Sequence, residues 1–475
     1  MPSRVIRVSQ DVHDELRTRI SAIQSEQGVP ADFPGEVINA AEHAAQSPRL
    51  PDQDLTTLPF VTIDPPTSMD LDQAMHLERA GSGYVVYYAI ADTAAFITAG
   101  DPIDQECHQR GETLYGADSK IPLHPKVLSE DAASLLPGEV RPAIVWRLTL
   151  DAAGDLAETH VSRARVCSRS KLDYESVQAS LDAGESTYSL LKEIGQLRQA
   201  AEAARGGVSL PMPEQEVTIE GDRWGLAFRQ PLPVELWNAQ ISLLTGMAAA
   251  QIMLNAKVGI LRTLPPADQR ALDRLRHTAR ALKVRWPGSM SYPEFVRSLD
   301  VANPQHAAMV VACTTLLRGA GYVCFNGEIP AQPMHAAIAA PYTHVTAPLR
   351  RLVDRYALET CVALCAGEPV PTWVLDAFAK LPETMKASGR RARAYENAIV
   401  DLVEAEVLRD SVGETFRGVV LEIDPEDPRR GSIQIGEPAV EATVFDQHQA
   451  LPIGEEITVR LAKADPDARA VAFEV

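Results

Sequence analysis

Residues 61–75 read VTIDPPTSMDLDQAM and place three aspartates, Asp64, Asp70 and Asp72, within nine residues. The β-branched and apolar run before Asp64 predicts a strand, and the two prolines after it turn the chain because proline cannot donate to a strand ladder. Asp70 and Asp72 are two residues apart, so in an extended segment both side chains point to the same side. The stretch therefore predicts a cluster of carboxylates at the end of a strand.

Three carboxylates packed this closely repel one another, and their pKa values rise unless a cation offsets the charge. Oxygen-rich sites suit Mg²⁺, with Mn²⁺ as the alternative ion, especially where substrate phosphates supply further ligands. Two such ions can assist the attack of water on a phosphodiester at the attacking and the leaving oxygen. The spacing alone also fits a solvated acidic loop, whereas an EF-hand is disfavoured because its glycine and trailing glutamate are missing.

Length and composition limit the class of protein. The chain has 475 residues, which suits about three domains, or one large enzymatic domain with smaller ones. Its 45% hydrophobic and 23% charged residues are ordinary globular values and argue against a disordered chain, a coiled coil or a disulfide scaffold. The net charge of −19 means that a polyanion must be held by a local site rather than by the overall field.

Cysteine usage and hydropathy predict a soluble, cytoplasmic protein. The six cysteines form no C-x-x-C pair and no zinc-type cluster with histidine, so we expect reduced thiols. The N-terminus MPSRVIRVSQDVHDELRTRI lacks the apolar region of a signal peptide. No apolar run reaches the ~18 residues that span a bilayer, so no membrane partner is expected.

The periodicity of the chain predicts an α+β protein. Residues 1–50 have helical spacing, and four strands follow that favour a mostly antiparallel sheet. The strands are expected at 60–63, 84–92, 144–151 and 160–168, and the later helices at 190–205, 235–254, 268–284, 349–366 and 372–410. Five short strands after residue 411 suit a small barrel of the OB type.

A second informative segment is YTHVTAPLRRLVDRY, residues 342–356. Pro348 can start a helix, which would place Arg350, Arg351 and Asp354 in its opening turns. Helix N-termini and arginine forks both favour phosphate oxygens, and an arginine beside a metal can stabilise a phosphoryl transition state. Taken alone, the segment also fits a surface helix on which Asp354 pairs with one of the two arginines.

Together these segments resemble the RNase II/RNB exoribonuclease family. Its catalytic pattern T-I-D-x(5)-D-x-D-D stands here as Thr62-Ile63-Asp64, Asp70, Asp72 and then Gln73. Three further blocks resemble the family in the same order. They are YYAIADTAAFITAGDPIDQE, RGETLYGADSKIPLHPKVLSEDAASLLPGEVRPA and YTHVTAPLRRLVD, and the four blocks cover about 300 residues.

The resemblance implies a fold and an activity. It implies a helical N-terminal extension at 1–50, an RNB catalytic domain at 51–410 with a mixed or antiparallel sheet, and a C-terminal OB/S1-like domain at 411–475. The implied activity is Mg²⁺-dependent 3′→5′ hydrolysis of single-stranded RNA to nucleoside 5′-monophosphates, without an organic cofactor.

The resemblance also assigns residues. Asp64, Asp70 and Asp72 match the metal-binding carboxylates, Asp72 also matches the most essential catalytic residue, and Arg350 matches the arginine on the scissile phosphate. Tyr115 matches the tyrosine that stacks on the 3′-terminal base region, which suits an enzyme that accepts any sequence. The remaining RNA-contact candidates are Thr346 and Arg351 from the family block and Arg390, Arg391 and Arg393 from the basic run KASGRRAR at 386–393.

Two departures from the family pattern leave alternatives open. Gln73 replaces the fourth aspartate and removes one negative charge, so a catalytically weak or inactive chain that only grips RNA stays an alternative. A further alternative, independent of these departures, is an exonuclease that acts on DNA as well as RNA. Many members carry two cold-shock barrels before the motif. We expect none within the residues that precede it here, which have too few strands, so the N-terminal stretch serves either as a small clamp or as packing on the core.

Overall fold

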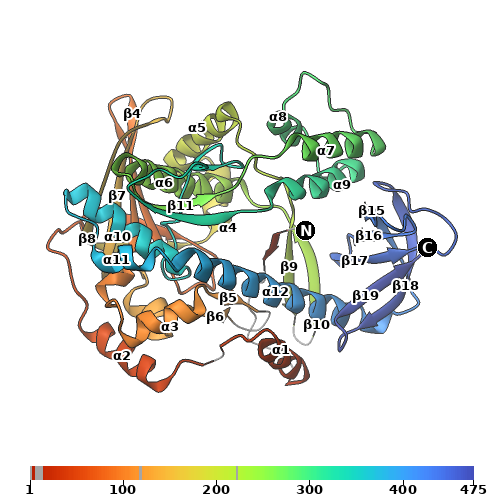
Figure 1. Ribbon diagram of the computed structural model, residues 1–475, viewed down its shortest axis with the longest axis horizontal. Coiled ribbons are helices and arrows are strands. Elements are labelled where there is room, and N and C mark those ends of the chain that lie inside the picture. The colour runs from red at the N-terminus through yellow and green to blue at the C-terminus, as the bar shows by residue number, and fades with distance from the viewer. Residues whose placement is uncertain (1–2, 6–13, 31, 117–119, 221–222) are drawn as a thin grey trace.

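The computed structural model describes the chain except for residues 1–2, 6–13, 31, 117–119 and 221–222. Two closed five-stranded barrels lie at opposite ends of the molecule, and helices fill the space between them (Figure 1). The mixture of helices and sheets confirms the predicted α+β class.

The first barrel is built from the strands around the aspartate segment. Its strands are β2 (Phe60–Ile63), β3 (Gln73–Ala80), β4 (Gly83–Ala91), β7 (Val140–Leu150) and β8 (Leu156–Leu172). Neighbouring strands pair antiparallel, as predicted, and a parallel pair of β2 and β8 closes the barrel. The β4 strand is buried almost throughout, which explains its unbroken apolar sequence.

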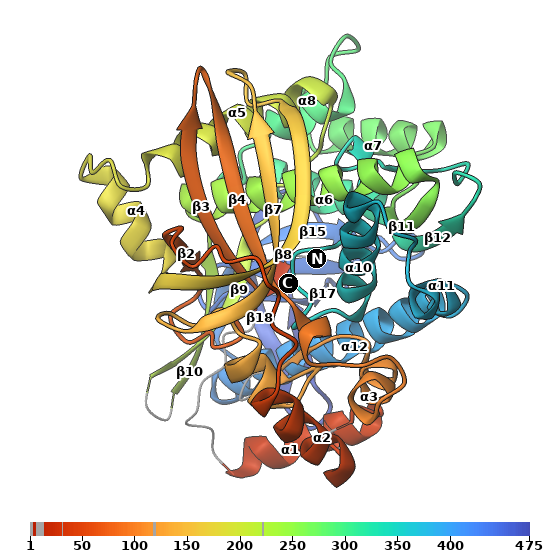
Figure 2. The same cartoon turned by 90° about the vertical axis from the view of Figure 1, so that its left-hand side faces the viewer.

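Helices cover this barrel. They are α3 (Pro102–Arg110), α4 (Tyr174–Asp182), α5 (Ser189–Arg205), α6 (Pro233–Ala256) and α10 (Leu352–Ala366). The α6 helix packs against α5 and α10, and because both neighbours bury it, its sequence is apolar nearly all round. Figure 2 shows the long strands side by side with α10 next to β8.

The N-terminal stretch packs on the core. Most of it is helical, as predicted, in α1 (Asp14–Glu26) and α2 (Gly35–Gln46). Leu16, Ile20 and Ile23 of α1 share an apolar cluster with α12 (Leu381–Leu408). Ser3–Val5 instead form β1, which pairs with β9 (Glu214–Glu220), itself paired with β10 (Arg223–Arg229). The partner of β1 lies some 200 residues away, so no local pattern announces this strand.

Between the barrels, α7 (Gln269–Ala281), α8 (Tyr292–Arg297) and α9 (Pro304–Cys313) share an apolar cluster of their own, and α9 contacts the second barrel. The α12 helix runs from the first barrel toward the second (Figure 1). The remaining short elements are α11 (Thr372–Ala377), β5 (Leu114–Tyr115), β6 (Lys120–Ile121), β11 (Val258–Thr263), β12 (Gly321–Asn326), β13 (Met334–His335) and β14 (Ala340–Pro341).

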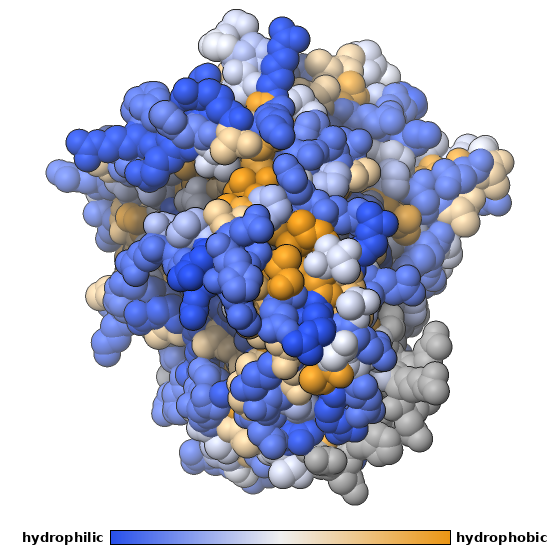
Figure 3. Space-filling view, turned by 90° about the vertical axis from the view of Figure 1, so that its right-hand side faces the viewer, coloured by the Kyte–Doolittle hydropathy of each residue, from blue (hydrophilic) through white to orange (hydrophobic). Residues whose placement is uncertain are grey.

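The second barrel consists of the five strands predicted after residue 411. They are β15 (Thr415–Ile423), β16 (Arg430–Ile435), β17 (Val440–Phe445), β18 (Glu456–Asp465) and β19 (Ala470–Glu474). A parallel pair of β17 and β19 completes it. The side of the molecule that carries this barrel is mainly hydrophilic, with an apolar strip near its centre (Figure 3). In the described part of the chain, every helix is too short or too polar to cross a membrane.

Candidate active site

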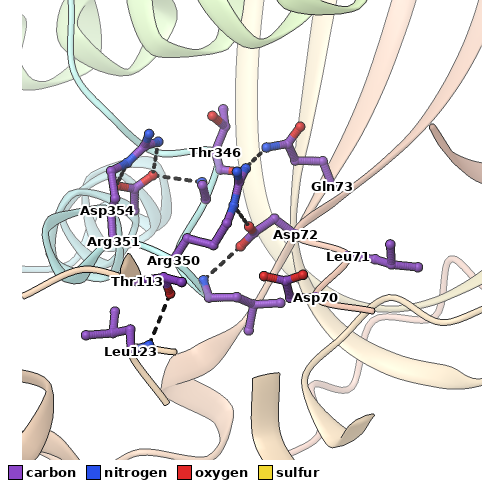
Figure 4. A network of polar contacts seen from close by, with 12 residues as sticks. Asp70, Leu71, Asp72, Gln73, Thr113, Leu123, Thr346, Arg350, Arg351 and Asp354 are labelled. Atoms are coloured by element: carbon purple, nitrogen blue, oxygen red, sulfur yellow. Dashed lines mark hydrogen bonds and ion pairs between the residues drawn. The ribbon is translucent and has the colours of Figure 1, made fainter. Parts of the chain in front are cut away.

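The aspartate segment and the arginine segment meet at one end of the first barrel. Asp72, which is 2% exposed, accepts a hydrogen bond from Arg350 Nε at 2.7 Å and another from the Leu349 amide at 2.8 Å. Figure 4 shows the Asp72 carboxylate facing the guanidinium of Arg350, with Asp70 beside it. The fold thus brings together two residues that lie 278 positions apart in the sequence.

The turn before α10 holds Arg350 in place. Asp354 accepts hydrogen bonds from the Ala347 amide at 2.8 Å and from both Nε and Nη2 of Arg351, at 2.9 and 3.0 Å. The helix therefore begins at Leu352, and both arginines precede it rather than lie in its first turns as expected. Arg351 is committed to Asp354, whereas the Arg350 side chain remains 40% exposed and free to meet a ligand.

Asp64 and Asp70 differ in what surrounds them. Asp70 Oδ1 accepts from Lys120 Nζ at 2.7 Å, and the same ammonium lies 3.0 Å from Glu130. The Asp64 carboxylate, which directly follows β2, has no hydrogen-bond or ion-pair partner among the described residues. Lys171 donates to the carbonyls of Pro66 and Ser68, at 2.6 Å each, and so fixes the loop between the two aspartates.

Burial and neighbouring charges shift the pKa values of Asp64 and Asp72. Burial raises the pKa of Asp64 to about 6 and that of Asp72 to about 7. The positive charge of Arg350 opposes both increases, while the negative charge of Asp70 adds to both. The charge of Arg350 thus limits the rise of both pKa values.

The fit of these residues to a metal ion is partial. Within the described ranges, no group of three or more His, Cys, Asp or Glu side chains is arranged to hold one. Asp64 nevertheless offers two oxygens without a partner in the described chain, and only one oxygen of Asp70 is engaged there. Carboxylate oxygens are the ligands that Mg²⁺ or Mn²⁺ prefers, so Asp64 and Asp70 are the residues that would hold such an ion, but the described side chains alone do not complete its ligand set.

Gln73 is built into the wall of the site. Its Oε1 accepts from the Tyr88 hydroxyl at 2.7 Å, and its Nε2 donates to the Thr346 carbonyl. Thr346 is 3% exposed, and its hydroxyl contacts that of Ser242 at 2.9 Å. The amide oxygen of Gln73 is therefore occupied within the protein, and the Thr346 side chain, predicted to contact RNA, is turned inward.

Tyr115 lies in the same site. It stands in β5, and its side chain is hydrogen-bonded to Arg350, which opposes the rise in the Tyr115 pKa that burial causes. The sequence prediction missed two carboxyls beside it, Glu112 and Glu396. Burial raises the pKa of both, to about 7 for Glu396, which accepts a backbone hydrogen bond from Tyr115. Glu396 lies three residues beyond the basic run that drew attention to this helix.

The three arginines predicted on the basic run separate in the structure. Arg390 and Arg393 on α12 are exposed. Arg391 instead donates to the carbonyls of Gln109 and Arg110 at the end of α3, at 2.8 and 2.7 Å. Two of the three therefore face solvent where a phosphate could reach them, and the third joins two helices.

Comparison with known proteins identifies a family domain in each of the two parts of the chain that contain a barrel. A family model described as the RNB domain matches residues 52–364, and one described as the RNase II-type exonuclease C-terminal S1 domain matches residues 414–475. Ribonuclease R of Mycoplasma genitalium is 27% identical over 324 residues, which cover 64% of this chain and 44% of that protein. Ribonuclease R of Escherichia coli is 25% identical over 418 residues, which cover 82% and 51%. The chain thus spans about half the length of the curated relatives it matches.

Solved structures share the fold. M. genitalium RNase R in complex with ribose-methylated single-stranded RNA has a TM-score of 0.85 at 20% identity, covering 98% of this chain and 79% of that one. At these identities the likeness concerns the fold alone. The predicted division at residues 50 and 410, and the predicted site residues, stay predictions.

Proposed function

The chain belongs to the RNB family, and from that premise we propose that it is a 3′→5′ exoribonuclease that hydrolyses single-stranded RNA to nucleoside 5′-monophosphates. The observation that carries the proposal is the contact of Asp72 with Arg350, at 2.7 Å, in a site that also contains Asp64, Asp70 and Tyr115. This set combines a carboxylate cluster with a guanidinium, as phosphodiester hydrolysis requires.

Arg350 is the proposed phosphate-binding group. Asp72 binds its guanidinium at 2.7 Å, the Tyr115 side chain lies beside it, and the exposed remainder would meet the approaching RNA. An arginine fixed in this way stabilises the negative charge that grows on the phosphoryl oxygens, without moving during the reaction. Asp72 is a catalytic residue in this proposal because it also faces the reacting phosphate.

Metal dependence is general among RNB-family exoribonucleases, and we propose Mg²⁺, or Mn²⁺ in its place, for this chain. Asp64, Asp70 and Asp72 are the candidate ligands, and Asp64 is the most open of them. A divalent cation bound there would supply an activated water and neutralise charge on the phosphate. The protein contributes a site in which the three carboxylates are buried or half-buried.

The RNA end is proposed to lie against Tyr115. Stacking on an aromatic ring does not depend on the base, so it suits a nuclease that removes nucleotides of any sequence. Arg390 and Arg393 on α12, which contacts β5, can hold backbone phosphates further along the strand. The 2′-hydroxyl is the group by which the site would prefer RNA to DNA.

Cytoplasmic location is part of the same proposal. All six cysteines are free thiols, and four of them are buried. Free thiols are typical of a reducing compartment.

A second candidate function is RNA binding without cleavage. Gln73 favours it, because the amide is held between Tyr88 and Thr346 and adds no free oxygen to the site. A solved structure described as that of yeast Ssd1, a pseudonuclease, shares the fold with a TM-score of 0.69 at 16% identity, over 92% of this chain and 56% of that one. The fold is therefore compatible with both functions.

The two functions are separated by the decay of 5′-labelled oligo(A). We expect stepwise shortening from the 3′ end with Mg²⁺, release of AMP, and no shortening after a chelator is added. A matched deoxy-oligonucleotide measures the preference for RNA. Intact RNA at high enzyme concentration, together with binding in a gel shift, would instead establish the non-cleaving function.

A further inference from the structure

A second cleft, of about 510 Å³, lies beside the end of β4, and its volume is in the range of small-molecule sites. Figure 2 shows α10 between β8 and α11, and these three elements form part of the wall. No residue of the candidate active site is among the described residues that line the cleft. The lining side chains that carry a charge or an aromatic ring are Arg49, Asp92, Arg163, Arg355, Glu359 and Trp373.

The inner end of the cleft contains two buried polar atoms without a partner. Asp92 is 1% exposed, and its Oδ2 accepts from Arg163 Nε at 2.7 Å, whereas its Oδ1 has no hydrogen-bond partner among the described residues. Arg355 forms a neutral ion pair with Asp104, in which Nη1 donates at 2.6 Å, whereas its Nε has no such partner in the described chain. Nearly all buried polar atoms of folded proteins are hydrogen-bonded. A free acceptor and a free donor at one cleft therefore indicate groups that a bound molecule can satisfy.

Charge is unevenly distributed around the cleft. Arg163 pairs with both Asp92 and Glu359, so the inner part keeps one negative charge. Arg49 has no acidic partner in the described chain; it donates to backbone carbonyls of the loop at 94–99 and is exposed. The cleft thus has a positive mouth and an inner end that can accept a hydrogen bond, in a chain with a net charge of −19.

Two further groups are open to a ligand. The Arg163 side chain is 30% exposed, and its Nη1 has no hydrogen-bond partner among the described residues, since Nε and Nη2 contact the two acids. Trp373 is half-buried, and the guanidinium carbon of Arg355 lies 4.8 Å from the centroid of its ring. Guanidinium groups bind phosphate oxygens, and aromatic rings stack on nucleobases of any kind.

We propose that this cleft binds a nucleoside 5′-monophosphate. The phosphate would meet Arg49 and Arg163 Nη1, and the base would stack on Trp373. A base edge such as that of adenine, with an amine donor beside a nitrogen acceptor, would supply the partners of Asp92 Oδ1 and Arg355 Nε. Inorganic phosphate would leave both the ring and the Asp92 oxygen without a partner. The proposal goes beyond the exoribonuclease function, whose product has this chemistry, and it does not depend on RNA cleavage.

Equilibrium dialysis with radiolabelled AMP, in EDTA and without RNA, tests the proposal. An Arg350→Ala chain is used, because it lacks the proposed phosphate-binding group of the active site, and it is expected to bind one AMP. Arg49→Gln on this background is expected to raise the Kd for AMP about 10- to 100-fold, the effect of one charged hydrogen bond, and to leave the Kd for adenosine unchanged. Trp373→Leu is expected to raise the Kd for both about 5- to 150-fold and to leave the binding of inorganic phosphate unchanged.

Arg169→Gln and Trp286→Leu are the matched controls. Arg169 is an exposed arginine that donates to a backbone carbonyl, that of Thr56, as Arg49 does in its loop. Trp286 is half-buried, and the guanidinium carbon of Arg276 lies 4.5 Å from the centroid of its ring. Neither control residue lines the cleft, so both variants are expected to bind AMP like the background chain.

Absence of AMP binding by the Arg350→Ala chain, or a Kd that neither Arg49→Gln nor Trp373→Leu changes, would overturn the proposal. Photolabelling of the unsubstituted chain with 8-azido-AMP decides the matter if a variant fails to fold. The label is expected on peptides that contain residues 94–99 or Trp373. Label confined to the segments of the active site would contradict the proposal.

The oligo(A) assay keeps the two proposals apart. A chain that binds AMP in the cleft but leaves RNA intact would contradict the exoribonuclease and support the nucleotide site. A chain that shortens RNA and binds no AMP in the cleft would do the reverse.

Discussion

The two closed barrels have five strands each, yet only the first carries a candidate site. In the second barrel, all six basic side chains after residue 411 have an ion-pair partner. In the first, Asp64 has no partner in the described chain, and Arg350 keeps 40% of its side chain exposed beside Asp72. A closed barrel is therefore not sufficient for a candidate site. The first barrel has one because charged side chains at its end are not fully paired within the protein.

The difference begins at the strand ends. The first barrel interrupts its sheet between β2 and β3 with a nine-residue acidic loop, and the turn before α10 reaches that loop from outside the barrel. The second barrel has 13 acidic and six basic side chains, a net charge of −7, which does not favour RNA phosphates. We therefore expect chemistry and most of the RNA affinity to depend on the first barrel.

Asp72→Asn should give the largest effect. It keeps the shape of the side chain but removes the charge that orients Arg350 and faces the phosphate, so single-turnover RNA hydrolysis should fall about 10³-fold. RNA binding in a gel shift should change little. Asp427→Asn in the second barrel, which removes an ion-pair partner of Arg429, is the control and should leave the rate unchanged.

Arg350→Ala should follow, with a loss of about 10²–10³-fold in the single-turnover rate, because it removes a donor to the charge that develops on the phosphate. Arg350→Lys should recover only part of the rate, since an ammonium is a point charge without the planar fork by which a guanidinium can bind Asp72 and a phosphate at once. A wild-type rate for Arg350→Ala would contradict the claim that the incompletely paired charges beside the first barrel carry the activity.

Low pH should reduce the free energy of unfolding, because the buried His124 near the first barrel becomes protonated. Burial lowers the pKa of His124 to about 4, against 6.5 for an exposed histidine, so its contribution to stability is present above pH 6.5 and lost as the pH falls toward 4. The loss amounts to about 3 kcal/mol. Denaturant unfolding of the wild type and of His124→Gln from pH 7 to 4 measures it.

The difference between those two chains isolates the histidine. Asp64 and Asp72, whose pKa values are raised, change stability in the opposite direction over this range. If the wild type and His124→Gln lost stability in parallel from pH 7 to 4, the acid effect could not be assigned to His124. His448 is the only histidine of the second barrel and is exposed, so His448→Gln should leave the curve unchanged.

Tyr115→Ala should weaken RNA binding by roughly 1–3 kcal/mol, the range of one stacked base, or about 5- to 150-fold in Kd. Tyr115→Phe should keep most of that affinity because it keeps the ring. A fluorescence-anisotropy titration on the Asp72→Asn background, where RNA persists, measures both. Equal reductions for the two variants would assign the role to the hydroxyl that contacts Arg350 rather than to the stacking ring.

The smallest effect compares two pairs of arginines. Replacing Arg390 and Arg393 with alanine should lower the slope of log Kd against log salt by about 0.7 for each RNA phosphate that the protein no longer neutralises. Replacing Arg429 and Arg430, which are both paired with Asp427, should leave the slope unchanged. A larger change in slope on replacing Arg429 and Arg430 would indicate that RNA binds along the C-terminal barrel instead.

Sequence reasoning reached the second barrel and four strands of the first, because period-2 strands and their turns are local patterns. It did not predict β3 (Gln73–Ala80) or the parallel pairing of β2 and β8 that closes the first barrel, since that closure joins segments far apart in the chain. It also identified Asp72 and Arg350 before their 2.7 Å contact was known, through four blocks in the order of a known family. It missed Lys120 and Glu396, because a lone lysine or glutamate carries no pattern until tertiary contacts place it. It put Arg350 and Arg351 inside a helix, since it could not anticipate that Asp354 holds the Ala347 amide and delays the helix start to Leu352.

A crystal structure of the Asp72→Asn variant with single-stranded RNA tests the central claim most directly. The account predicts that the 3′-terminal phosphodiester lies within hydrogen-bonding reach of the Arg350 guanidinium, on the side of Asp64. An RNA 3′ end bound against the C-terminal barrel, or anywhere out of reach of Arg350, would contradict it.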